Sequence, residues 1–417
     1  MKRLSVLAAA VFASVVGHAQ PLPTTTPQEA GFSPEGLQRL NAFFEREIKA
    51  ERVPGAVVAI ARNGKLVHYE AHGMLNKATG TPMPKDAIFA LASMTKIMTS
   101  VGALQLTEDG RLPLKSKLSD YYPGFANMKV GVAQADGVLK LVPQERPIFI
   151  HDLFRHTSGL TYGGRGNHPI SRLYPGGTDP AIEGNTQAFI DRITPLPLAH
   201  QPGTTFEYSF STDVLGAVVE KVTGQRLGAV LYAGVWKPLG MNDTSFNVPA
   251  AKKARVAMAF ANNPLDGKPQ SIPVIDKETQ SDCGGACSFG TVGDYLRFGQ
   301  MLMNGGELDG KRVLSPQTVA HMTSNHLTPE IKNMVAAVEP HRDGFGFGLG
   351  VAVRTTAGLS AVPGNPGEYT WNGAFGTAFF ADPKEKLVVV VGTAAPGDLR
   401  KYYREQVQNI VYGAMVK

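Results

Sequence analysis

Ser93 and Lys96 are the residues of this sequence whose types and spacing are best suited to nucleophilic chemistry. They frame the tetrapeptide Ser-Met-Thr-Lys, which follows an apolar run and opens a helical pattern over 97–106. Residues three apart share one face of a helix, so Ser93 Oγ and Lys96 Nζ can meet. A serine at a helix N-terminus also lies where backbone N–H groups and the helix dipole favour developing negative charge. The pair predicts a nucleophilic serine, with the lysine as base if burial or neighbouring cations hold it neutral part of the time.

The tetrapeptide alone is a weak signal. A chain of this length and composition contains one serine–lysine pair at this spacing by chance, and this chain has one. An ordinary helix start with an exposed lysine fits the same residues equally well. The two interpretations separate only when other segments are considered.

Two further segments favour the catalytic interpretation. Tyr208 lies in a loop just before a helical pattern, from which its hydroxyl could hydrogen-bond Ser93 and Lys96 and shuttle a proton. Trp371-Asn372-Gly373-Ala374 precedes the strand pattern of residues 376–381. A glycine at a strand edge lets a backbone N–H approach a ligand closely, which would supply a second oxyanion donor.

In this order, the three segments resemble the serine β-lactamase and penicillin-binding-protein superfamily. They are most similar to its class C branch and to the related family VIII carboxylesterases. That branch carries S-x-x-K, then Y-x-N or Y-S-x, then K-T-G or a Trp/His-x-Gly variant. The resemblance covers nearly the whole chain after its first residues. Further segments that look like this family are His156–Leu160, Trp236–Met241 and Gly305–Gly310.

The resemblance implies the role of each residue. Ser93 would be the acylated nucleophile, and Lys96 and Tyr208 would transfer its proton. The backbone N–H groups of Ser93 and Ala374 would form the oxyanion hole. No metal or cofactor is expected for this chemistry.

Two departures from the lactamase pattern indicate the substrate. Phe210 stands where the lactamases have an asparagine that contacts the lysine and the substrate amide, and Trp371 stands where they have a lysine that helps to bind the drug carboxylate. Both changes remove polar recognition, and we expect the Phe210 ring to widen an apolar lining. Asn372 and Gly373 complete the expected substrate-binding set. The predicted activity is a carboxylesterase for neutral short- to medium-chain esters, with a small-molecule ester, or a β-lactam, as ligand.

Other activities use the same machinery. A class C-type β-lactamase, a D-amino-acid peptidase or amidase, and an acyltransferase with a non-water acceptor are the nearest alternatives. A non-catalytic penicillin-binding sensor is a further one, which the presence of Ser93, Lys96 and Tyr208 disfavours.

The elements that must position these residues predict an α/β (α+β) fold. They are a helix over 34–50, a hairpin of 55–60 and 66–69, a hairpin of 376–381 and 387–391, and a helix over 397–415. Hairpins near both ends predict one antiparallel sheet flanked by helices, the serine β-lactamase-like arrangement. We assign 28–111 and 283–417 to this sheet domain and 112–282 to an inserted, mainly helical domain.

The first 19 residues have the pattern of a signal peptide. Lys2 and Arg3 precede the apolar stretch 4–16, and small residues at Gly17 and Ala19 predict cleavage before Gln20. The stretch is too short to span a bilayer. A periplasmic or secreted protein without stable membrane insertion is expected.

Charge and cysteine content exclude some other classes. The net charge of +6 is modest for 417 residues and the basic residues are scattered, so we expect no nucleic-acid partner. Cys283 and Cys287 either form a small-loop disulfide or stay unpaired, and both remain open. His151 and His156 do not fit H-E-x-x-H and are expected to be structural.

Overall fold

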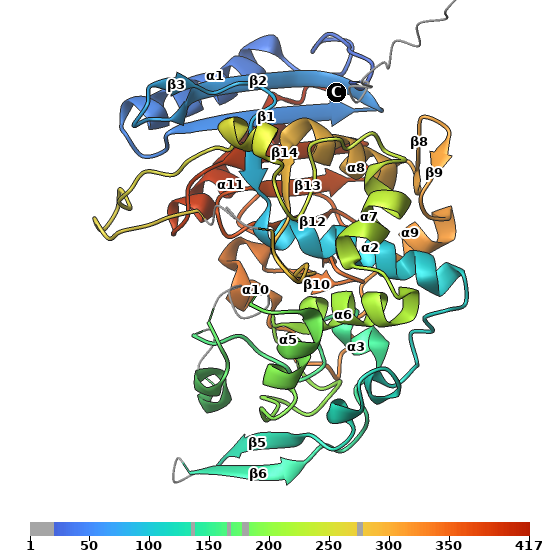
Figure 1. Cartoon of the computed structure of the whole chain (residues 1–417). Coiled ribbons are helices and arrows are strands. Elements are labelled where there is room, and N and C mark those ends of the chain that lie inside the picture. The colour runs from blue at the N-terminus through green and yellow to red at the C-terminus, as the bar shows by residue number, and fades with distance from the viewer. Residues whose placement is uncertain (1–20, 135–137, 165–167, 177–182, 273–277) are drawn as a thin grey trace, which may run out of the picture.

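The computed structural model describes residues 21–134, 138–164, 168–176, 183–272 and 278–417. In these residues, helices flank an antiparallel sheet (Figure 1), which confirms the predicted mixed α/β fold. The signal peptide expected at residues 1–19 lies outside the described residues.

One eight-stranded sheet joins segments from both ends of the described chain. Its strands are Gly55–Arg62 (β1), Lys65–Asn76 (β2), Thr81–Pro82 (β3), Phe345–Phe347 (β10), Ala352–Arg354 (β11), Tyr369–Asn372 (β12), Ala378–Asp382 (β13) and Leu387–Thr393 (β14). The strand order is β10-β11-β12-β13-β14-β1-β2-β3, with every neighbouring pair antiparallel. The pairing of β1 with β14 brings the two predicted hairpins side by side.

The first hairpin turns where its sequence predicts. Asn63 and Gly64 connect β1 to β2 with φ values of 53° and 76°. Both angles are positive, as the tight turns that match the twist of paired strands require. Asparagine and glycine tolerate this backbone region better than other residues do.

The rest of the described chain contains ten α-helices and three short strand pairs, joined by turns and loops. The helices are Pro34–Lys49 (α1), Thr95–Glu108 (α2), Ile150–Phe154 (α3), Thr186–Ile193 (α5), Ser211–Thr223 (α6), Leu227–Leu231 (α7), Val292–Met303 (α8), Pro316–Met322 (α9), Val335–Val338 (α10) and Leu399–Ala414 (α11). The short pairs are Ile88–Ala90 (β4) with Phe289–Thr291 (β7), Lys129–Ala133 (β5) with Leu139–Pro143 (β6), and Glu307–Leu308 (β8) with Lys311–Arg312 (β9). None of the helices in the described parts is long and apolar enough to cross a membrane.

Alternation along the strands divides the core into two layers. In β1, Val58 and Ile60 belong to a cluster with buried residues of α1 and α11. Val57 and Ala59 point the other way, into the larger cluster that contains α2 and α8. This two-residue period is that of a strand with both faces buried. The catalytic motifs must lie on the side of the larger cluster, where α2 begins.

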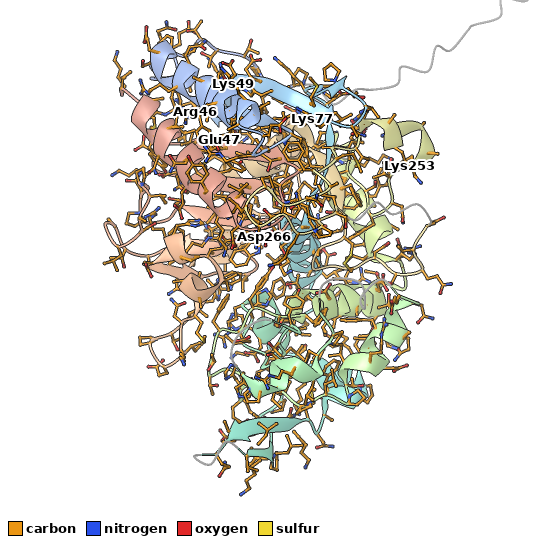
Figure 2. All side chains as sticks on the ribbon, turned by 90° about the vertical axis from the view of Figure 1, so that its left-hand side faces the viewer. Arg46, Glu47, Lys49, Lys77, Lys253 and Asp266 are labelled. Atoms are coloured by element: carbon orange, nitrogen blue, oxygen red, sulfur yellow. A yellow bond between two sulfur atoms is a disulfide. The ribbon has the colours of Figure 1, made fainter. Side chains whose placement is uncertain are left out.

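α1 shows how local signals set an element that covers the sheet. The Ser33 side chain caps it by accepting from the Gly36 N–H at 3.1 Å, and Pro34 occupies the first helical position. Figure 2 labels Arg46 and Lys49 on α1, and both are exposed to solvent. The helix therefore presents an apolar face to the sheet and a charged face to water.

The chain between the two halves of the sheet contains α3, α5, α6 and α7. It also contains the hairpin β5–β6, which lies at the end of the molecule far from the main sheet (Figure 1). The larger buried cluster continues from the sheet into this segment without interruption. The assignment of 112–282 as a separate domain stays a prediction.

Candidate active site

A strained turn presents Ser93. The chain passes from β4 through the 3-10 turn Ala92–Met94 into α2, and Ala92 adopts a positive φ of 45°. This backbone region is unfavourable for alanine and recurs where a fold over-determines a functional residue. From residue 87 to residue 104, Ser93 is the one side chain that is not fully buried. We expected Ser93 to open the helix itself; it lies in the turn just before it.

Lys96 is buried beneath Ser93 and fully hydrogen-bonded. Its side chain is 1% exposed, and Nζ donates to Ser93 Oγ at 3.5 Å, to the Tyr162 hydroxyl at 3.2 Å and to the Gly285 carbonyl at 2.5 Å. An ammonium has three N–H donors, so each one has an acceptor here. One of these three acceptors is the serine hydroxyl itself.

Asp213, in the first turn of α6, supplies the counter-charge for this lysine. Its Oδ2 accepts from the Tyr162 hydroxyl at 3.2 Å, and its Oδ1 accepts from the Gly285 N–H at 2.9 Å. The two groups that receive Lys96 therefore also donate to Asp213, which closes a ring of hydrogen bonds. Burial raises the pKa of the Asp213 carboxyl, while Lys96 and these donors act in the opposite direction.

Tyr208 approaches from the loop before α6. Its hydroxyl accepts from Trp371 Nε1 at 3.2 Å, and Lys96 Nζ lies 4.7 Å from the centre of its ring. The ring of His156 packs 4.9 Å from the ring of Tyr208, and burial holds the pKa of His156 well below its usual value. His156 is thus a neutral support for the tyrosine loop, as expected.

The end of β12 forms the opposite wall. Ser93, Tyr208 and Ala374 line one pocket of about 30 Å³, together with Asn372 and Gly373. The expected oxyanion donors, the N–H groups of Ser93 and Ala374, thus belong to residues of one pocket. A Cβ at Gly373 would come within 2.4 Å of the Leu91 carbonyl, so only glycine allows this approach. Trp371 and Asn372 belong to β12, an inner strand of the sheet that the sequence analysis did not predict, and Gly373 follows its last residue.

Phe210 is placed differently from our expectation. Its ring is fully buried and packs 4.3 Å from the Tyr162 ring and 5.7 Å from the Phe189 ring. It is absent from the linings of the described pockets around Ser93. Tyr162 is the side chain that lies between Phe210 and Lys96. Phe210 therefore packs against this tyrosine and does not widen the pocket.

The two cysteines form a disulfide, which settles the question that the sequence left open. Cys283 and Cys287 are joined with a Cα–Cα distance of 5.3 Å. The closed loop carries Gly284, whose carbonyl accepts from Thr99 Oγ1 at 2.8 Å, and the Gly285 peptide that contacts Lys96. The disulfide therefore holds part of the lysine site.

A larger groove adjoins the pocket and shares Tyr208, Val338 and Arg400 with it. Its volume is about 220 Å³. The lining is Phe206, Glu207, Tyr208, Met334, Ala337, Val338, Arg400 and Lys401. Apolar side chains from the Tyr208 loop and α10 form one wall, and cations of α11 form the rim.

Sequence reasoning missed several residues of the site. Tyr162, Asp213, Arg342, Arg400 and Arg404 were not selected. Asp213 follows Tyr208 by five positions at a predicted helix start, which is a usable signal for a buried acid near the site. The others come from distant segments with no motif. No cluster of three or more potential metal ligands occurs among the described residues.

Asp213→Asn tests the hydrogen-bond ring around Lys96. The amide keeps the size of the side chain and removes its charge. Its NH₂ group also faces either the Tyr162 hydroxyl or the Gly285 N–H, the two groups that donate to Asp213. We expect kcat/KM to fall at least about tenfold, which corresponds to about 1.4 kcal/mol, because hydrogen bonds to charged groups contribute about 1.5–3 kcal/mol. Steady-state kinetics with an ester substrate measures this.

Asp294→Asn is the matched control. Asp294 also lies in the first turn of a helix and is 5% exposed, as is Asp213, but it accepts from Asp243 and Thr244 away from the pocket. Its substitution should lower stability without a comparable loss of kcat/KM. Equal losses in both variants would show that Asp213 only stabilises the fold.

Known proteins similar to this chain confirm its family. A profile of the Beta-lactamase family matches residues 40–410. Esterase EstB of Burkholderia gladioli is 30% identical over 381 residues, which cover 85% of this chain and 89% of EstB. Lovastatin esterase of Penicillium rubens is 29% identical over 394 residues, which cover 89% of this chain and 98% of that protein. The solved structure of EstCE1, titled a hydrolase with promiscuous acyltransferase activity, matches with a TM-score of 0.74 and 27% identity over 91% of this chain and 98% of that chain.

These similarities extend over the sheet and the segment between its halves. The chain therefore belongs to the Beta-lactamase family and is a serine hydrolase related to the family VIII carboxylesterases.

Proposed function

We propose that the protein is an exported carboxylesterase that hydrolyses neutral short- to medium-chain esters through an acyl-enzyme on Ser93. The observation that carries this proposal is the hydrogen bond from Trp371 Nε1 to the Tyr208 hydroxyl at 3.2 Å. An indole N–H is a donor without charge, and here it is directed at the tyrosine. A substrate carboxylate thus receives no cation from the position that is a lysine in the lactamases. The relatives named as esterases support an ester as the substrate.

Acylation begins with attack of Ser93 Oγ on the ester carbonyl carbon. The hydroxyl proton passes to the Lys96–Tyr208 pair, and the N–H groups of Ser93 and Ala374 stabilise the oxyanion. Collapse of the intermediate expels the alcohol, which takes up the proton and leaves the acyl group on Ser93. Water then attacks the acyl-enzyme and gives its proton to the same pair. The acid leaves and the serine hydroxyl is restored.

The adjoining groove suits the apolar part of such an ester. Phe206, Met334, Ala337 and Val338 supply carbon surface beside the pocket of Ser93. Each methylene buried there contributes about 0.8 kcal/mol. Short- to medium-length acyl or alcohol chains therefore gain binding energy without any charged contact.

A β-lactamase or D-amino-acid peptidase activity is the second candidate, and one observation favours it. Arg400 and Arg404 of α11 line the pocket of Ser93, so cations lie near the site although Trp371 is neutral. Their charges are partly committed to the protein. Arg404 forms an ion pair with Glu339 at 2.5 Å and also donates to the Gly373 carbonyl, and Arg400 donates to the Gly397 carbonyl. An anionic substrate must compete with these partners.

A substrate panel separates the two candidates. For a short-chain p-nitrophenyl ester, kcat/KM should exceed that for nitrocefin by at least about a hundredfold, the roughly 2.7 kcal/mol scale of a lost charged contact. A D-Ala-D-Ala peptide should be a poor substrate for the same reason. Ser93→Ala is the control and should abolish turnover of every substrate.

Comparable values for ester and nitrocefin, or a preference for nitrocefin, would reject the esterase and favour the lactamase. A stable penicillin label without turnover of either substrate would instead favour the penicillin-binding sensor. Transfer of the acyl group to an added alcohol, faster than hydrolysis, would identify an acyltransferase.

Export is part of the proposal, and it has a separate test. The mature protein is expected to begin at Gln20, because Gly17 and Ala19 supply the small residues that signal peptidase requires. N-terminal sequencing of protein recovered from the periplasm or the medium measures the cleavage site. Exported material that starts at Met1, or protein retained by a lipid, would contradict this.

A further inference from the structure

Arg342 differs from the other buried arginines among the described residues. Four of them pair with a carboxylate: Arg62 with Glu385 at 2.8 Å, Arg297 with Asp309 at 2.5 Å, Arg354 with Glu368 at 3.0 Å, and Arg404 with Glu339 at 2.5 Å. Arg342 is 1% exposed, and in the described parts of the chain it forms no such ion pair. A buried guanidinium without a carboxylate is costly, which calls for a reason beyond stability.

The contacts of Arg342 lead to the catalytic tyrosine. Its guanidinium carbon lies 4.4 Å from the centre of the Trp371 ring. With the Asn372 amide oriented to satisfy its neighbours, the amide oxygen accepts from Arg342 Nη2 at 2.6 Å, and the amide nitrogen donates to the Trp371 carbonyl. Trp371 in turn donates its ring N–H to Tyr208 at 3.2 Å. Arg342 therefore holds both the indole and the neighbouring amide.

The charge of Arg342 is offset only in part by the groups around it, and Glu339 is the first of these. Burial lowers its pKa to about 10, so it remains protonated at neutral pH. The groups that face it are Glu339, His341, Glu368, Arg404 and Tyr208. Glu339 pairs with Arg404 and Glu368 pairs with Arg354, while burial lowers the pKa of His341 to about 3 and keeps it neutral. Each of these carboxylates has another arginine as its ion-pair partner, and the Arg342 guanidinium lies over the face of Trp371.

We infer that Arg342 is a positioning residue for the hydrolysis, and that it acts through Trp371 and Asn372 to favour the deprotonated form of the Tyr208 hydroxyl. The inference rests on the proposed function, in which Tyr208 accepts a proton. A cation against the indole face strengthens the polarity of its N–H, and in a buried site such a contact contributes about 2 kcal/mol. The same charge would stabilise a phenolate on Tyr208, whose oxygen accepts from that N–H.

Other charged and titratable groups also face Tyr208. Lys96 faces the tyrosine ring from α2, and His156 faces it from the loop after α3 as a neutral imidazole. Arg400 and Glu207 share the linings of its pockets. Lys96 is compensated by Asp213 through Tyr162. Arg342 contacts the face of Trp371, whose ring N–H donates to the tyrosine oxygen.

Arg342→Met removes the charge and keeps an unbranched side chain over the indole. We expect kcat for p-nitrophenyl butyrate to fall at least about tenfold and the acidic limb of the kcat/KM profile to move about one unit to higher pH. The limb moves to higher pH because loss of a cation disfavours the deprotonated tyrosine, and a higher pH is then needed to form it. Arg342→Lys keeps a charge at the site and should leave the limb near its wild-type position.

Arg297→Met is the control for the loss of a buried arginine. Arg297 lies on α8, and its partner Asp309 is 53% exposed. This variant should lower the melting temperature without moving the limb. If Arg342→Met does not fold, Trp371→Phe takes its place, since it removes the indole N–H and should move the limb in the same direction.

The outcomes separate this inference from the proposed function. The pH dependence of inactivation by a fluorophosphonate is the second readout, because it follows Ser93 activation without ester turnover. If the wild type hydrolyses esters and the acidic limb of Arg342→Met stays in the wild-type position, the inference is rejected and the proposed function is not. A wild type that turns over no ester rejects the proposed function, and the inactivation rate still tests Arg342. Equal shifts in Arg342→Met and Arg297→Met would also overturn the inference.

Discussion

The burial of the Lys96 ammonium is the constraint on which the rest of the site depends. A charge that is 1% exposed must have its donors accepted and its charge compensated, or the fold loses several kcal/mol. One of its acceptors, Ser93 Oγ, lies three residues away, and the other two come from distant segments: the loop with Tyr162 and the disulfide loop with Gly285. Only when these segments pack together is the lysine satisfied. The same packing brings the serine to the pocket.

Local signals were sufficient to predict α1 and the hairpins β1–β2 and β13–β14. The serine cap and proline that begin α1, and the Asn-Gly turn between β1 and β2, are backbone requirements that a few adjacent residues determine. The order of the motifs around Ser93, Tyr208 and Trp371 predicted the family for a similar reason. Each motif is a few residues long, and the reaction allows only certain residue types at its positions, so the motif can be recognised in the sequence.

Contacts between distant segments could not be predicted in this way. Asp213 and Arg342 act through residues that lie far from them in sequence, and burial decides their importance. Phe210 was expected to line the pocket because its position in the lactamases is polar and faces the substrate. The structure places Tyr162 between this ring and Lys96, which a linear reading of the motif does not reveal.

The central claim is that Ser93 is the nucleophile, and covalent labelling tests it most directly. The protein is incubated with a fluorophosphonate, digested, and the modified peptide is identified by mass spectrometry. The account predicts a single modified residue, Ser93, with no label in Ser93→Ala and loss of ester hydrolysis in proportion to labelling. A label on another serine, or full activity after Ser93 is modified, would contradict it.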